Sequence, residues 1–168
     1  TTDGTTALFI AAQNGYKEIV QLLLTAKSVV DATTTDGRTA LCIAAKHGHV
    51  DVVELLLNSG AAANKAMTDG ITALYIAAYN GYVDVLQLLL RAKPVVDATT
   101  TDGETALYVA AQNAHKEIVQ LLLEAYASVN QQNNKGVTAL HMAAWNGHVD
   151  VVELLLNSGA AANKAMTD

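Results

Sequence analysis

The 168-residue sequence contains little cysteine, proline or aromatic residue: one Cys, one Pro, one Phe, one Trp and six Tyr. The single thiol, Cys42, forms no intrachain disulfide, so cystine bridges do not hold the fold together. We expect this thiol to be buried beside packed helices. No stretch approaches the ~18 consecutive apolar residues of a membrane-spanning helix, and no signal peptide is visible. We therefore expect no membrane partner and a cytoplasmic location.

Basic residues are also scarce. Sixteen Asp and Glu against ten Lys and Arg give a formal net charge of −6 at pH 7. A nucleic-acid-binding domain carries a clustered basic surface, so we expect no nucleic acid partner. The charges are scattered along the chain and form no charged tail.

What the sequence does contain is a repeat. The motif Thr-Ala-Leu-x-x-Ala-Ala recurs every 33 residues without an insertion, and a Leu-rich apolar run follows each copy. The copies begin at Thr6, Thr39, Thr72, Thr105 and Thr138. A fixed period of this length predicts a stacked array of helical units, in which function resides on an extended surface rather than in a deep pocket.

Each unit reads as a turn, a short helix, a second turn, a longer helix and a polar loop. In the first unit, Asp3-Gly4 is a tight-turn dipeptide, and Thr6 is suited to cap a helix expected at residues 7–13. Gly15 is suited to the left-handed conformation after that helix, and Ile19–Leu24 give the second helix an apolar face. Two such helices cannot bury their apolar faces alone, so the sequence predicts an all-α helix-turn-helix solenoid.

The period places the units at residues 1–33, 34–66, 67–99, 100–132 and 133–165, with the start of a sixth at 166–168, in one domain spanning 1–168. Length, turn and motif together resemble ankyrin repeats, whose pattern is Gly-x-Thr-Pro-Leu-His-x-Ala-Ala, then a turn, then Val-Val-x-Leu-Leu-Leu. Two departures stand out: alanine replaces the proline in all five units, and the histidine survives only as His141. The resemblance implies a scaffold that binds a partner protein through turn tips and inner helices.

The positions that differ between units are where we expect specificity. Residues four apart share a helix face, so the fifth, ninth and thirteenth positions of each unit form one surface, which we call the inner face. Tyr79 and Trp145, at the thirteenth position, are the strongest candidates for exposed anchors, because Tyr and Trp dominate binding hot spots. Phe9, Tyr75 and Tyr108, at the ninth position, are expected to fill gaps between units. The candidate partner-binding residues are Arg38, Lys46, Ile71, Tyr79, Glu104, Gln112, Val137 and Trp145.

Catalytic, cofactor and metal sites are not indicated. The sequence has no Gly-rich phosphate loop, no Gly-x-Ser-x-Gly and no activated nucleophile. The aspartate at four of the turn tips recurs because the turn recurs, and units ~8–10 Å apart are too distant to share an ion. The start of the second helix accepts either His or Tyr, which indicates a structural role rather than zinc binding. Its occupants are Tyr16, His49, Tyr82, His115 and His148.

Exact internal copies favour an alternative interpretation. Residues 48–69 and 147–168 are identical, and the chain starts and stops inside the same motif. The alternative to a natural partner-binding module is therefore an engineered or excised array without a selected partner, studied for its fold and stability.

The sequence also predicts which unit is the least stable. In the fourth unit Ala114 replaces the glycine after the first helix, and Tyr126 replaces the one after the second, so this unit is expected to be the least stable. Lys27 and Lys93 replace the glycine after the second helix in the first and third units.

The terminal units also lack the polar outer faces of capping repeats, which predicts end-to-end self-association. The apolar side chains among which we expect some to lack part of their partner surface are Ile10, Val20 and Leu23 at one end and Val152, Leu155 and Leu156 at the other.

Overall fold

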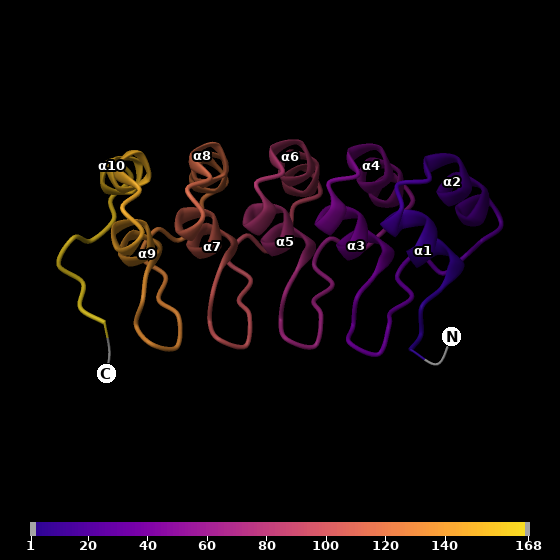
Figure 1. The fold of residues 1–168 in the computed structure, drawn as a ribbon, viewed down its shortest axis with the longest axis horizontal. Coiled ribbons are helices and arrows are strands. Elements are labelled where there is room, and N and C mark those ends of the chain that lie inside the picture. The colour runs from indigo at the N-terminus through magenta and orange to yellow at the C-terminus, as the bar shows by residue number, and fades with distance from the viewer. Residues whose placement is uncertain (1–2, 167–168) are drawn as a thin grey trace.

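The computed structural model describes residues 3–166, and within that range it contains ten α-helices and no strand. The helices form five pairs: α1 (Ala7–Gln13) and α2 (Lys17–Thr25), α3 (Ala40–His47) and α4 (Val50–Asn58), α5 (Ala73–Asn80) and α6 (Val83–Arg91), α7 (Ala106–Gln112) and α8 (Lys116–Glu124), α9 (Ala139–Trp145) and α10 (Val149–Asn157). Figure 1 shows the odd-numbered helices in an inner layer, the even-numbered ones in an outer layer, and long loops that project from the inner layer. The predicted all-α solenoid is confirmed. Residues 167–168 of the predicted sixth unit lie outside the described residues, and the unit boundaries remain a prediction.

A threonine cap starts the inner helix of each unit. The Thr6 hydroxyl accepts a hydrogen bond from the backbone N–H of Phe9 at 3.1 Å, and the Thr39 hydroxyl accepts one from Cys42 at 3.2 Å. Such a bond satisfies one of the N–H groups that a helix start leaves without a partner. The cap therefore fixes the helix start although alanine stands where the family's pattern has proline.

The core follows the array as one continuous line of small and branched side chains. The Ala44-Ala45 and Ala77-Ala78 pairs are fully buried, which lets adjacent inner helices approach closely. Leu56 and Leu89 are also fully buried, between the two layers. Each inner helix packs against its own outer helix and against the inner helices of the neighbouring units.

Backbone hydrogen bonds join the loop tips of adjacent units. The N–H of Thr35 donates to the carbonyl oxygen of Asp3 at 2.9 Å, and the N–H of Thr68 donates to that of Asp36 at 3.1 Å. The same bond recurs between the later units, from Thr101 to Asp69 and from Asn134 to Asp102. This ladder holds the tips in a row, each at a fixed position relative to the next.

The four residues that replace glycine keep the left-handed conformation. The φ angles are 63° at Lys27, 54° at Lys93, 59° at Ala114 and 65° at Tyr126. The turns therefore retain the geometry of the glycine-containing units, and a side chain occupies a backbone region that costs roughly 1 kcal/mol. The fourth unit carries two of these strained residues.

The end faces expose apolar side chains, but not all of those predicted. Ile10 is 47% exposed and Leu156 is 42% exposed. The prediction was wrong for Val20 and Leu155, which are fully buried because both belong to the hydrophobic core of the array. Leu22, which was not predicted, is 69% exposed at the N-terminal end.

Candidate partner-binding surface

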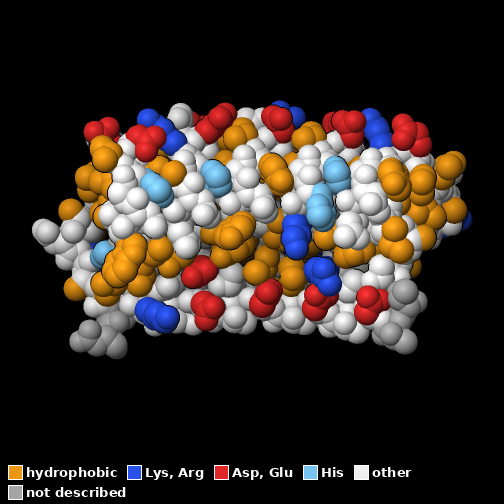
Figure 2. All heavy atoms as spheres, in the orientation of Figure 1, with side chains coloured by type: hydrophobic (Ala, Val, Ile, Leu, Met, Phe, Trp, Pro, Cys, Tyr) orange, Lys and Arg blue, Asp and Glu red, His pale blue; other side chains and the backbone are white. Residues whose placement is uncertain are grey.

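The loop edge and the inner face differ in character. Figure 2 shows acidic side chains in a row along the loop edge, with hydrophobic and basic side chains between that row and the outer helices. The aspartates of the tips are Asp3, Asp36, Asp69 and Asp102. A partner that approaches the inner face therefore meets an apolar surface bordered by negative charge.

The inner face is hollowed between α3 and α5. The hollow has a volume of about 340 Å³, and Cys42, Ile43, Met67 and Ile76 supply apolar side chains to its lining. It brings together four of the eight predicted binding residues, which are Arg38, Lys46, Ile71 and Tyr79. The other four belong to α7, α9 and the loops before them, so the structure does not place them in this hollow.

The small side chain of Cys42 accounts for the hollow. In the first and third units the ninth-position side chain reaches the fifth-position residue of the next unit: the Phe9 ring centroid lies 5.7 Å from the Arg38 guanidinium carbon, and the Tyr75 hydroxyl donates to Glu104. Cys42 is too short to cover Ile71 in this way, and its Sγ instead lies 4.0 Å from the carbonyl oxygen of Lys65. The space that an aromatic ring occupies in the first and third units is open here.

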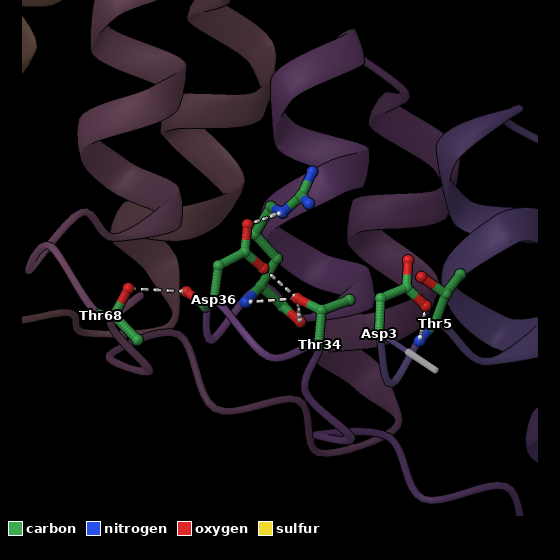
Figure 3. A network of polar contacts seen from close by, with 6 residues as sticks. Asp3, Thr5, Thr34, Asp36 and Thr68 are labelled. Atoms are coloured by element: carbon green, nitrogen blue, oxygen red, sulfur yellow. Dashed lines mark hydrogen bonds and ion pairs between the residues drawn. The ribbon is translucent and has the colours of Figure 1, made fainter. Parts of the chain in front are cut away.

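Arg38 is held in place at the rim of the hollow. Its Nε lies 2.7 Å from Oδ2 of Asp36, and its backbone N–H donates to the Thr34 hydroxyl at 3.0 Å (Figure 3). The same Thr34 hydroxyl donates to the Asp36 carboxylate. This hydrogen bond, together with the Arg38 guanidinium, lowers the pKa of Asp36 below its ordinary value. The ion pair partly neutralises Arg38, whereas Lys46 is exposed and forms no ion pair with any residue in the range 3–166.

Tyr75 and Glu104 form a polar contact beside the hollow. The Tyr75 hydroxyl donates to Oε2 of Glu104 at 2.8 Å, and Tyr75 is half-buried. Burial and this hydrogen bond raise the pKa of the Tyr75 hydroxyl. Phe9 and Tyr108 are buried, so they fill gaps between units as predicted. Tyr75, for which the same role was predicted, is only half-buried and lines the hollow. Glu104 therefore supports the third unit in addition to lying on the inner face.

The two predicted aromatic anchors are exposed at the ends of their helices. Tyr79 is 53% exposed and borders the hollow, whereas Trp145 is 84% exposed two units further along. Exposure of this extent on a large aromatic side chain leaves area for a partner to cover. Their part in binding remains a prediction.

The predicted structural role of the second-helix histidines is confirmed. His49 Nε2 lies 2.9 Å from the carbonyl oxygen of Gln13, and His148 Nε2 lies 2.9 Å from that of Gln112. His115 makes the same contact with Tyr79. Sequence reasoning missed these acceptors, although the separation of 36 residues, one period plus three, recurs in all three pairs.

Cys42 is buried, as predicted, and burial raises the pKa of its thiol. Among residues 3–166, no group of three or more His, Cys, Asp or Glu side chains is arranged to hold a metal ion. None of the described helices is long and apolar enough to cross a membrane.

Comparison with known families agrees with this architecture. A family model described as ankyrin repeats (3 copies) matches residues 8–102 and residues 74–166. No curated protein sequence matches the chain. Ankyrin repeats are generally protein-interaction modules and typically serve as non-enzymatic scaffolds. Because the two matches together span nearly the whole chain, it belongs to the ankyrin repeat family.

Proposed function

We propose that the chain binds a partner protein through its inner face, with the hollow between α3 and α5 at the centre of the contact. The observation that supports this is the composition of the hollow. An apolar lining carries Tyr79 and Ile71 at its border, with a cation from Arg38 and another from Lys46. Binding hot spots combine a buried apolar centre, aromatic and Arg side chains, and a polar rim in this way.

The size of the hollow favours a protein over a small molecule. Its volume of about 340 Å³ is near the lower end of the ~300–1,000 Å³ range of small-molecule sites. The hollow also opens on a surface that continues along the remaining inner helices. A protein segment can insert one side chain there and extend over the neighbouring units.

Trp145 is the second proposed anchor. It occupies the same position in the fifth unit as Tyr79 does in the third. Val137 in the fifth unit and Gln112 in the fourth also belong to the inner face. A partner that fills the hollow and covers both anchors spans the second to the fifth units. Glu104, between them, supplies the acidic group of this half of the surface.

One observation favours a second candidate. Residues 48–69 and 147–168 are identical, although they lie in different parts of the array. An array assembled or excised for its fold, without a selected partner, accounts for such copies. It predicts that no protein is retained through the inner face.

The test compares variants that alter the surface without altering the fold. Partners are captured from extracts on immobilised protein, and the affinity of each purified partner is then measured by calorimetry. Tyr79→Ala and Trp145→Ala should each weaken binding by about 2 kcal/mol or more. Cys42→Tyr, which introduces the residue that the third and fourth units carry at this position, should weaken it by filling the hollow. Tyr126→Ala, on a side chain 92% exposed outside the inner face, is the matched control. Unchanged affinity in the first three variants would contradict the proposal.

A further inference from the structure

We propose that the hollow between α3 and α5 selects a peptide segment in which an apolar side chain is adjacent to Asp or Glu. This inference rests on the proposed function, since it names the chemistry of the partner that the inner face would bind. It follows from the lining, the charges and the location of the hollow.

The lining calls for an apolar side chain. Cys42, Ile43, Met67, Ile71 and Ile76 contribute apolar atoms, and the volume of about 340 Å³ is too small for a helix, which is ~10–12 Å wide. A polar side chain placed there would lose its water without finding enough hydrogen-bond partners. An aliphatic or aromatic side chain loses only unfavourable contact with water.

The charges call for an acidic neighbour. Arg38 precedes α3 and Lys46 lies in its last turn, so the two cations stand at opposite ends of one wall of the hollow. No Asp or Glu lines the hollow. Arg38 is already paired with Asp36, whereas Lys46 has no ion-pair partner within residues 3–166. A carboxylate one or two residues from the inserted side chain can therefore reach the Lys46 ammonium group.

The rest of the chain makes this preference selective. The formal net charge is −6 and the tips carry a row of aspartates. An acidic peptide is repelled from the tips and attracted at Lys46, so a mispositioned complex is disfavoured. A basic peptide would instead be drawn to the tips and away from the hollow, and this is the competing outcome of the test.

The experiment selects short random peptides displayed on phage against the immobilised protein. We expect enrichment of sequences in which a Leu, Ile, Met or aromatic residue lies within two positions of Asp or Glu. The same selection against Lys46→Glu should replace those acids with Lys or Arg. Lys93→Glu, which makes the same change of charge in the loop after α6, should leave the enrichment unchanged.

The best peptide, synthesised with a fluorophore, is then titrated by fluorescence anisotropy. Lys46→Glu should weaken its binding by about fivefold to tenfold, because it removes one attraction and adds a repulsion at an exposed site. Lys46→Met, which removes only the charge, should cause a smaller loss. Thermal melting of each variant tests whether the fold is retained.

The outcomes separate this inference from the proposed function. One outcome overturns the acidic preference and leaves the binding surface in place. In it, the selected peptides bind Tyr79→Ala more weakly, but they contain no Asp or Glu, or the selection against Lys46→Glu still enriches peptides with Asp or Glu. If the peptides bind Tyr79→Ala and Cys42→Tyr as well as the parent protein, both proposals fail. Enrichment of basic peptides, or of no sequence family, also overturns the inference.

Discussion

The Nε2 atom of His115 lies 3.0 Å from the backbone carbonyl oxygen of Tyr79. The same ring covers Gly81, where an added Cβ would lie 2.7 Å from the Cε1 atom of His115. The outer helix of the fourth unit therefore fixes the end of the inner helix of the third, and this is the helix end that carries a proposed anchor.

Replacing His115 tests how much this contact stabilises the array. His115→Ala should lower the free energy of unfolding by about 1 kcal/mol or more, because a hydrogen bond to a main-chain carbonyl and the packing of the ring are lost. His115→Tyr should cost less, since Tyr82 already packs over Gly48 at the equivalent position. Urea denaturation measures both variants. A His115→Ala protein as stable as the parent would show that water replaces the bond at no cost.

Ala114→Gly should stabilise the fourth unit. Ala114 has a φ angle of 59°, where glycine avoids the steric cost of a Cβ. Part of the gain is offset because glycine is more flexible in the unfolded chain. We expect a net gain of about 0.5 kcal/mol, which raises the melting temperature by about 1–2 °C for a chain of this size. Differential scanning calorimetry measures the shift.

Two reverse substitutions are controls for that variant. Gly147→Ala places a Cβ at a φ angle of 73° with nothing within 4 Å, so it should reveal the backbone cost alone. Gly81→Ala adds the contact with His115 to the same cost and should destabilise more. Equal melting temperatures for Gly147→Ala and the parent protein would contradict the explanation by backbone strain.

The contact between Tyr75 and Glu104 predicts a dependence on alkaline pH. Because the pKa of Tyr75 is raised in the folded state, the fold favours the neutral hydroxyl. This contribution to stability is fully present below the unfolded pKa of about 10 and is lost as the pH rises above it. The difference in the free energy of unfolding between the parent and Tyr75→Phe should therefore shift against the parent from about pH 8 to about pH 11. Tyr126→Phe controls for the loss of one tyrosine, and a difference independent of pH would refute the assignment.

The two end faces predict concentration-dependent association of the 168-residue chain. The contact joins unlike ends, with Leu22 and Ile10 on one and Leu156 on the other, so it propagates rather than closes. Sedimentation velocity should show larger species as concentration rises, and Leu22→Glu or Leu156→Glu should each suppress them. In an equal mixture, Leu22→Glu supplies an unaltered C-terminal end face and Leu156→Glu an unaltered N-terminal one. These two faces should pair, and the mixture should form dimers but no larger species. Val95→Glu, at an exposed internal site, is the control, and a monomer at every concentration would contradict the prediction.

The helices could be predicted from the sequence because their limits are local. Thr6 and Gly15 bracket α1, which spans Ala7–Gln13 as expected, since a cap and a left-handed residue act within a few positions. The exposure of Tyr79 and Trp145 followed from the same helical register.

The remainder depends on how neighbouring units meet. Val20 and Leu155 were assigned to the end faces wrongly, because the rotation of an outer helix about its axis decides which apolar residue faces inward. The hollow could not be predicted from the sequence either, although the residue that causes it can be identified there. Cys42 is the small member of an otherwise large set at the ninth position, but only the contacts from Phe9 to Arg38 and from Tyr75 to Glu104 reveal what that position covers.

The restriction of long-range hydrogen bonds to neighbouring units has a kinetic consequence. Among residues 3–166, the longest hydrogen bonds in sequence join residues 36 apart, as in His49 with Gln13. The chain therefore never closes a long loop as it folds, and a helix pair can add to whichever neighbour is already in place. Nucleation can therefore begin in any unit, and growth by one unit at a time closes only a short loop at each step. When tension is applied at the two termini, we expect the units to unfold from the ends of the array inward, one helix pair at a time.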